Sequence, residues 1–190
     1  MSVYELQEPL LSVESENDKH AATIRRILDT PGIQLNSRMC AWTHGEKIVT
    51  ALHIACFEDI HSHVGAQLLL SDERCDVNVQ DRPYGYTALM EAAQHVKSDG
   101  DMHHQIMRML LNHPRIDVNV QWPNENGAIR IACNSDIQTA LVAQMLQNDE
   151  RCDVNLRDAQ YNTALMIAAQ NIKSDSDTHF QIVRLLLNHP

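Results

Sequence analysis

The sequence predicts an all-α solenoid, in which short helix–turn–helix units stack side by side and β-hairpin connectors join them. Self-similarity is the first observation behind this prediction. Residues 87–114 and 163–190 are identical at 20 of 28 positions, and the segment SDERCDVN at 71–78 recurs as NDERCDVN at 148–155. The second observation is that small and apolar residues recur at helical spacing in each unit. Neither helix of such a unit can bury its apolar face alone, so neighbouring units must stack.

Four units begin near residues 50, 87, 127 and 163, and three short motifs recur in them. The first is a T-A-L-x-x-A-A/C segment, in which threonine is suited to cap a helix and the alanines permit close helix contact. The second is an L-L-L segment at the end of a second helix, and the third is a D-V-N exit that starts the connector. The last unit stops before its D-V-N exit, which indicates a fragment of a longer array or an incomplete final unit.

These motifs resemble the ankyrin repeat, whose units contain T-P-L-H-x-A-A, L-L-L and D-V-N segments. Residues 50–55, TALHIA, match the first motif most closely, with alanine where the family usually has proline. The resemblance implies an ankyrin-like stack over 50–190. It extends upstream, because 24–36 aligns with the second helix and exit of the unit at 107–119. We therefore expect residues 1–36 to form an N-terminal cap with a degenerate repeat and residues 37–49 to form a long connector.

Composition excludes several classes of protein. The 190 residues carry 15 basic and 25 acidic side chains, a net charge of −10, which leaves no electrostatic footprint for nucleic acid or an anionic membrane. No apolar run approaches the roughly 18 residues of a membrane span, and the acidic N-terminus lacks the basic start of a signal peptide. Five cysteines, an odd number, favour reduced thiols in a cytoplasmic compartment, which would be the host cytosol for a secreted effector.

Cysteine and histidine are the residues that could form a metal or catalytic site in this sequence. Cys56 and Cys75 are 19 residues apart, as are Cys133 and Cys152. Because Cys56 and Cys133 occupy one repeat position and Cys75 and Cys152 another, duplication explains the spacing. Among the 11 histidines, His53 fills the T-x-L-H position, where the family resemblance implies a structural hydrogen bond; the others are expected at surfaces and turns, including His61, His63, His103 and His104. No set of ligands has zinc spacing and no catalytic motif is present. We predict no enzyme activity, no cofactor, no metal and no disulfide.

Two units contain extra residues between their helices, at 95–101 and 171–177. The alternating aspartates of these insertions could belong to a weak calcium site or to a second docking ridge. A calcium loop would need more ligands than the insertions supply. We favour the simpler interpretation that Asp101 and Asp177 cap the second helix of their units.

The few aromatic residues gather in the connectors. In an ankyrin-like stack these connectors are fingers beside the concave face, and large rings on protruding turns are typical of binding hot spots. The predicted partner-binding aromatics are Trp42, Tyr84, Tyr86, Trp122 and Tyr161. Packing between fingers is the alternative role, and it is favoured for Trp42 and for Tyr161, which stands where the family usually has glycine.

Positions just after the A-A/C motif line the concave groove in the family that the sequence resembles. They differ from unit to unit while the framework stays constant, as expected of a binding surface on a repeated scaffold, and also of neutral drift. Five of them join the predicted partner-binding set, namely Phe57, Gln94, His95, Asn134 and Gln170.

The predicted function is non-catalytic binding of a protein partner through the fingers and the concave groove. A solenoid offers an extended surface and no deep pocket, so a small-molecule substrate is not expected. The alternative is the substrate-targeting arm of a larger enzyme or secreted effector whose catalytic domain lies beyond Pro190. The repeats are similar in style to arrays in secreted effectors of intracellular bacteria and in large DNA viruses.

Overall fold

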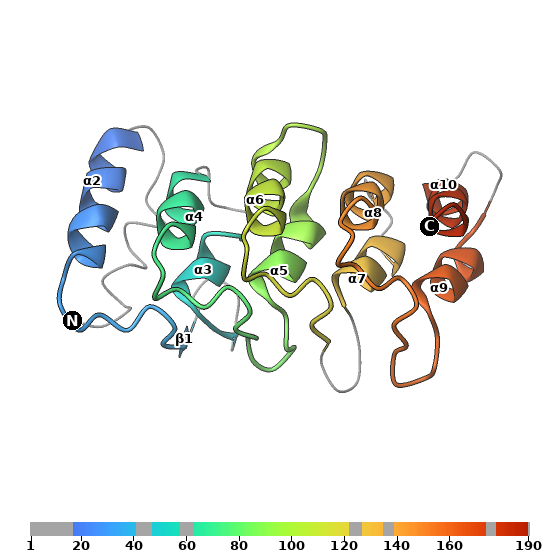
Figure 1. The fold of residues 1–190 in the computed structure, drawn as a ribbon, viewed down its shortest axis with the longest axis horizontal. Helices are drawn as coiled ribbons and strands as arrows, with labels where there is room; N and C mark the ends of the chain where they lie inside the picture. Colours follow the sequence, from blue (N-terminus) through green and yellow to red (C-terminus); the bar gives the residue numbers. More distant parts are fainter. Residues whose placement is uncertain are drawn as a thin grey trace.

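The computed structural model describes residues 17–40, 47–57, 63–121, 127–134, 139–173 and 178–189. This part of the chain is a row of helix pairs that runs from α2 at one end to α10 at the other (Figure 1). The elements, in chain order, are α2 (Asn17–Leu28), β1 (Met39–Cys40), β2 (Ile48–Val49), α3 (Ala51–Ile54), α4 (His63–Leu70), α5 (Ala88–His95), α6 (Met102–Leu111), α7 (Ala128–Asn134), α8 (Thr139–Gln147), α9 (Ala164–Gln170) and α10 (Thr178–Leu187).

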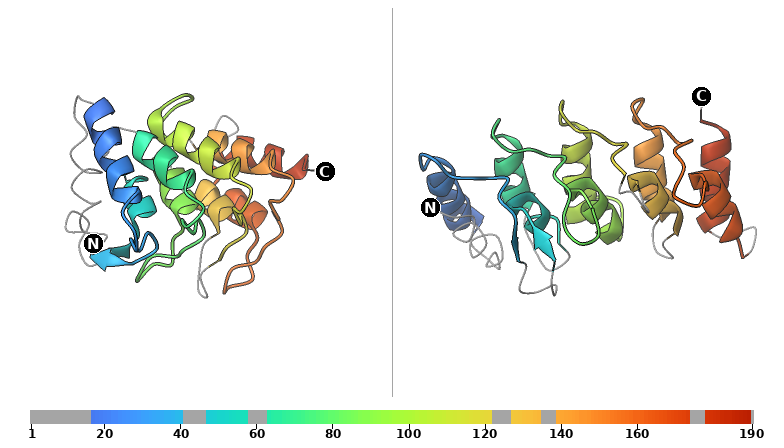
Figure 2. Two further views of the ribbon diagram at one scale, coloured as in Figure 1. Left: turned by 60° about the vertical axis from the view of Figure 1, so that its left-hand side comes forward. Right: turned by 90° about the horizontal axis from the view of Figure 1, so that it is seen from below.

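The helices lie in two layers. The first layer contains α3, α5, α7 and α9, and the second contains α2, α4, α6, α8 and α10 (Figure 1). Each helix of the first layer packs on the second helix of its own unit, and α3, α5 and α7 also pack on the first helix of the next unit. The connectors extend from the stack as fingers on the side of the first layer (Figures 1 and 2). The predicted all-α solenoid of repeated helix pairs is confirmed.

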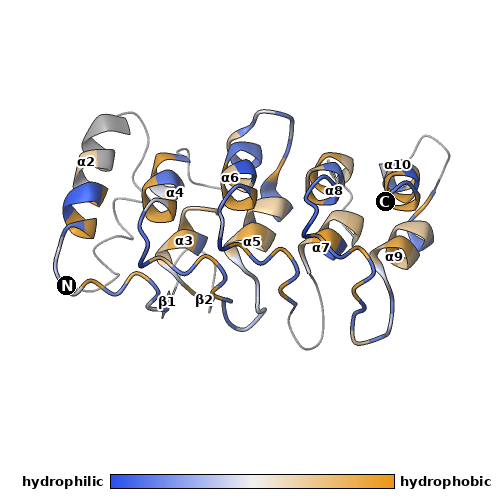
Figure 3. Ribbon diagram, viewed as in Figure 1, coloured by the Kyte–Doolittle hydropathy of each residue, from blue (hydrophilic) through white to orange (hydrophobic). Residues whose placement is uncertain are grey.

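The core is a continuous strip between the layers, where the apolar faces of the helices meet (Figure 3). The middle leucine of each L-L-L segment and the first alanine of each A-A/C segment are buried in every unit from 50 onward. These residues are Leu69, Leu110, Leu146 and Leu186, with Ala55, Ala92, Ala132 and Ala168. Small side chains let the helices approach closely while the leucines fill the space between layers, so an aromatic-poor sequence still packs a core.

Threonine starts the first helices, as the sequence predicts. The side chains of Thr87 and Thr163 accept hydrogen bonds from the backbone N–H of Met90 and Met166. Each satisfies one of the N–H groups that a helix leaves unpaired at its start. In the second helices, Asp101 does the same for His104 and also accepts from the backbone of Lys97 and Ser98. The capping interpretation of Asp101 is therefore confirmed, whereas Asp177 lies outside the described residues.

The D-V-N asparagines join each unit to the next. The amide of Asn78 donates to the carbonyl of Arg115 and accepts from the N–H of Asp117, which belongs to the following exit. Asn36 and Asn119 make the equivalent pairs of bonds one unit earlier and one unit later. One short side chain thus satisfies two backbone groups of its neighbour, which explains why asparagine recurs at this position.

Regular β-structure in the described part of the chain is confined to the 37–49 connector, where β1 pairs with β2 in an antiparallel sheet. A single bridge, Ile48 to Arg82, continues it to the next finger. The later fingers are closed by isolated pairs, as where the N–H of Asp81 donates to the carbonyl of Tyr86. The carboxylate of Asp81 also accepts from the N–H of Tyr86 at 2.7 Å, so an acidic side chain replaces strand pairing in shaping this turn.

Candidate functional site

The structure places only some of the predicted partner-binding residues. Trp42 and Trp122 lie outside the described residues, and the side chain of Asn134, at the end of α7, is not among those described. The remaining seven are placed. Four of them, Phe57, Tyr84, Tyr86 and His95, come together around Lys47, a residue that the sequence did not single out. We call this group, with Asp81 and Glu91, the Lys47 cluster.

Tyr84 and Tyr86 form the exposed edge of the cluster. Their ring centroids are 6.2 Å apart, and Gly85 between them has a φ of 70°. Glycine adopts this left-handed conformation without steric cost, which lets both neighbouring rings lie on one side of the finger. Tyr84 is 56% exposed, whereas Tyr86 is partly buried against the core. The finger therefore presents one accessible ring supported by a second.

Lys47 lies at the centre. Its ammonium is 5.4 to 5.6 Å from the ring centroids of Phe57, Tyr84 and Tyr86, within the range of cation–π attraction. The side chain comes from the connector just before α3, while the tyrosines belong to the next finger. Only 12% of the Lys47 side chain is exposed. The charge is therefore largely desolvated, and it ties two successive units together.

Glu91 neutralises this charge from α5. Its carboxylate oxygens accept from the Lys47 ammonium at 2.9 and 3.0 Å, and the side chain is 2% exposed. The other units have a buried isoleucine at the equivalent position, namely Ile54, Ile131 and Ile167. A buried ion pair is a poor route to stability compared with an apolar residue of similar volume. Glu91 is thus a local departure from the packing rule of the array, as expected of a site kept for another purpose.

The two carboxylates of the cluster differ in proton affinity. Burial raises the pKa of Glu91, but His95 and the Lys47 ammonium outweigh burial and hold it below its ordinary value. Burial dominates for Asp81, so its pKa is raised. Two contacts make the difference: Glu91 has a hydrogen bond with His95, which Asp81 lacks, and Lys47 is 2.9 Å from Glu91 but 3.7 Å from Asp81. The Oδ2 of Asp81 has no hydrogen-bond partner in the described part of the chain. Glu91 is therefore the principal counter-ion.

His53 and His103 border the cluster, and His103 and His104 correct the expectation of surface histidines. His103 is buried within α6, where its Nε2 lies 3.2 Å from the carbonyl of Phe57, and His104 beside it is also buried. Because burial lowers the pKa of His103, the neutral ring is favoured. His53 makes the expected structural bonds, since Nδ1 accepts from the N–H of Thr50 and Nε2 lies 2.9 Å from the Tyr86 carbonyl. The rings of His53 and His103 thus hold the two ends of α3 and the second finger, which is the connector that carries Tyr84 and Tyr86.

Phe57 requires a correction of role. Its side chain is 1% exposed, so it belongs to the core and supports Lys47 from below without offering surface to a partner. Gln94 and Gln170, by contrast, are exposed at the ends of α5 and α9. Tyr161 is 72% exposed and has a φ of 66°, which explains why glycine usually stands there. Its exposure disagrees with the packing role that the sequence favoured.

The chemistry available at the cluster is recognition. The nearby charged groups are paired and buried, and no group of three or more His, Cys, Asp or Glu side chains in the described residues is placed to hold a metal ion. Four cysteines, Cys56, Cys75, Cys133 and Cys152, are free and buried, and burial raises the pKa of each thiol. What the arrangement provides is an aromatic finger held rigidly above a neutralised charge.

Comparison with known proteins identifies the family. A family model described as ankyrin repeats, in three copies, matches residues 11–122, more than half of the chain. The chain belongs to the ankyrin repeat family. A solved structure described as the crystal structure of EF0377, an ankyrin repeat protein, matches with a TM-score of 0.47 and 18% identity, over 99% of this chain and 98% of that chain. No curated protein sequence matches.

Membership accounts for the stacked motifs and sets the general expectation for function. Ankyrin repeats are generally protein–protein interaction modules and are generally non-catalytic. The matched copies include the upstream unit, which the sequence indicated from residues 24–36. None of the helices in the described part of the chain is both long and apolar enough to cross a membrane. Within this chain the Lys47 cluster distinguishes the unit that starts at 87, because Glu91 stands where the sister repeats have isoleucine.

The sequence missed Lys47, Asp81 and Glu91, although one signal was present. Aligning the four T-A-L motifs places Glu91 among three isoleucines, and a charge in an apolar column indicates a compensating partner. The identity of that partner could not be read from the alignment. Lys47 precedes its helix by four residues and reaches into the next unit, a contact that only the stacked geometry creates.

Proposed function

We propose that this ankyrin array binds a protein partner through its fingers and concave groove, with Tyr84 as an anchor. The observation that carries the proposal is the Lys47 cluster, which holds an exposed tyrosine on a support of buried charges and rings. Exposed aromatic rings with little conformational freedom lose little entropy on docking. The general role of ankyrin repeats in protein–protein interaction supports the proposal.

Two further features support this surface. Gln94 is exposed at the end of α5, the helix that carries Glu91, and would add a polar group to the proposed surface. Tyr161 places another exposed ring on a later finger. Trp42, Trp122, Asn134 and Gln170 remain proposed members of the same surface. An apolar anchor with a polar rim is the usual arrangement of an interface that excludes water from its centre.

The test starts by replacing Tyr84 with a photo-crosslinking phenylalanine derivative and identifying the protein that becomes attached. With that partner purified, the dissociation constant is compared between the wild-type chain and Tyr84→Ala. We expect a loss of about 2 kcal/mol or more, roughly a 30-fold weaker affinity. Thermal unfolding should change little, because Tyr84 is more than half exposed.

Lys173→Ala is the control, since Lys173 is exposed in the turn after α9 and far along the stack from the second finger. It should leave the affinity unchanged. If Tyr84→Ala binds the partner as tightly as the wild type does, the anchor lies elsewhere. If it instead lowers the melting temperature sharply, the ring serves the fold.

A further inference from the structure

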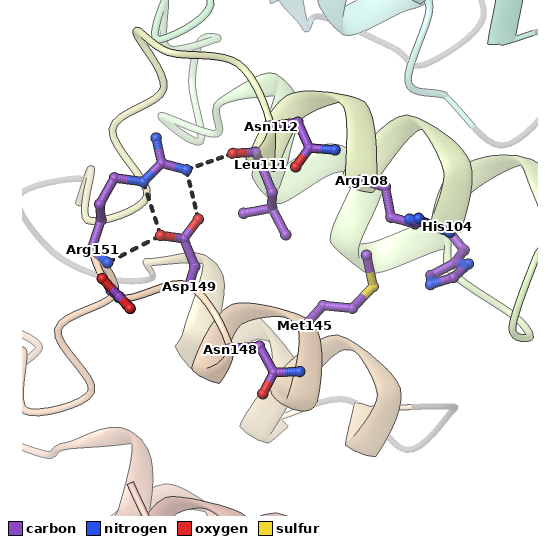
Figure 4. Close-up of a pocket in the computed structure, with 9 residues that line it drawn as sticks. His104, Arg108, Leu111, Asn112, Met145, Asn148, Asp149 and Arg151 are labelled. Carbon is purple, nitrogen blue, oxygen red and sulfur yellow. Dashed lines mark hydrogen bonds and ion pairs between the residues drawn. The ribbon is translucent and has the colours of Figure 1, made fainter. Parts of the chain in front are cut away.

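A second surface lies on the opposite side of the stack, between the helices of the second layer. A cavity of about 670 Å³ separates α6 from α8, and another of about 590 Å³ separates α2 from α4. Figure 4 shows the first of these, with Arg108 on α6 facing Met145 on α8 and Arg151 closing one end. Volumes of this size are typical of ligand sites.

The two cavities are repeat equivalents. All eight residues that line the cavity between α2 and α4 align with residues that line the cavity between α6 and α8. Each contains an arginine from the earlier helix, Arg25 or Arg108, and the D-E-R segment of the following connector. The grooves that alternate with them have glutamine, Gln67 or Gln144, on the earlier helix and no D-E-R segment. In the second layer, a groove with an arginine on its helix and a D-E-R segment on its connector therefore recurs at every second unit.

Part of that chemistry holds the stack together. In each D-E-R segment the aspartate and the arginine pair, and the guanidinium also donates to a carbonyl at the end of the preceding second helix. Arg74 bonds Asp72 and the Leu28 carbonyl, and Arg151 bonds Asp149 and the Leu111 carbonyl (Figure 4). This bridge fixes the connector to the end of the preceding second helix.

The remaining charges have no such structural role. Arg25 and Arg108 are exposed, as are Glu73 and Glu150, and no hydrogen bond or ion pair joins these four side chains to another described residue. Each groove thus has a cation on its helix wall, an anion on its connector wall, and partly or fully buried apolar side chains between them. The order of cation, apolar side chains and anion is the same in the two grooves, and the groove between α2 and α4 also contains the acidic Asp29 where the other groove has Asn112.

We propose that these two grooves bind a segment of a partner protein in which an apolar side chain is flanked by an acidic and a basic residue. The acidic residue pairs with the arginine of the helix, the basic residue pairs with the glutamate of the connector, and the apolar side chain enters the groove. Two equivalent sites on one chain recognise the same segment twice. This surface is separate from the fingers and adds a second mode of interaction to the one proposed above.

The experiment uses a display library of random short peptides selected on the wild-type chain and depleted on the double variant Arg25→Gln/Arg108→Gln. Glutamine is the matched replacement, because it occupies the same position in the alternate units. Isothermal titration of an enriched peptide should give two sites per wild-type chain, one site in each single variant and none in the double variant. Enriched sequences should carry an acid and a base beside an apolar residue.

Three results would overturn the proposal: no peptide that discriminates the wild type from the double variant, a peptide whose stoichiometry stays at two in the single variants, or selected sequences without the paired charges. Displacement of the peptide by millimolar free leucine would assign the grooves to small zwitterions and also reject a protein segment. Circular dichroism of the variants checks that their helices are intact. The exposed positions of Arg25 and Arg108 make unfolding an unexpected cause of lost binding.

Discussion

Removing Lys47 should expose the cost of the buried Glu91 carboxylate. In Lys47→Met the carboxylate stays 2% exposed and loses the donor that lies 2.9 Å away. Removing one partner of a buried pair typically costs about 3–5 kcal/mol, because an uncompensated charge remains. His95, 3.7 Å from the same oxygen, offers partial compensation, so we expect a value near the lower end of that range, about 3 kcal/mol. Urea unfolding followed by circular dichroism at pH 7 measures it.

The double variant Lys47→Met/Glu91→Ile is the matched control. It restores the isoleucine of the sister repeats and removes the charges of Lys47 and Glu91 together, while Asp81, whose pKa is raised by burial, loses the same ammonium in both variants. Replacement of a buried ion pair by apolar residues is often neutral or stabilising by about 1–4 kcal/mol, so the double variant should recover the stability lost in Lys47→Met. If Lys47→Met costs less than about 1 kcal/mol, or if the double variant is as unstable as the single one, the pair does not carry the energetics assigned to it.

Three further outcomes are expected. Burial lowers the pKa of His103 from 6.5, so the neutral ring stabilises the fold above that pH and the stabilisation is lost as the pH falls below it. In His103→Gln, which keeps a donor, the midpoint of urea unfolding should therefore change less between pH 7 and pH 5 than in the wild type. The four buried thiols, with pKa values raised by burial, should react with a disulfide reagent only as fast as the chain opens, and all five cysteines should react in denaturant. Asn78→Ala should lower the free energy of unfolding, measured in urea, by about 1 kcal/mol, because the Asn78 side chain makes two hydrogen bonds to the next unit. Asn155→Ala should lower it less, and equal losses would reject the stabilising role assigned to the D-V-N asparagines.

The sequence could predict the fold because the fold is repetitive. Each motif appears several times, so a position that is apolar in all copies, such as that of Leu69, can be predicted to be buried from the sequence alone. The capping role of Asp101 followed from local rules alone. The helices, caps and buried positions that recur in each unit depend mainly on contacts within the unit or with a similar neighbour. Such contacts can be predicted from the repeated sequence pattern.

The residues of the site were harder to predict from the sequence for the same reason. Phe57 was expected at the surface because it follows the A-C motif, yet it is buried where Lys47 and the second finger cover it. His103 and His104 were expected at a turn, but both are buried in the first turn of α6, where His103 lies 3.2 Å from the carbonyl of Phe57 in the preceding unit. Both errors concern contacts between unlike units. A single sequence does not specify which side chain of one unit meets which of the next.

The same one-dimensional arrangement limits how far any change can spread. In a stack, each unit contacts only its neighbours, so the coupling between Lys47 and Glu91 joins the units that start at 50 and 87 and stops there. Loss of Lys47 should therefore loosen Tyr84 and leave the α8 wall of the groove between α6 and α8 intact, since α8 and the connector after it belong to the next unit. Hydrogen exchange provides the comparison: in Lys47→Met, protection should fall in 47–57 and 81–95 and persist in 140–173. A uniform fall would mean that the chain unfolds as one cooperative unit, and the two surfaces would then share a single stability instead of acting independently.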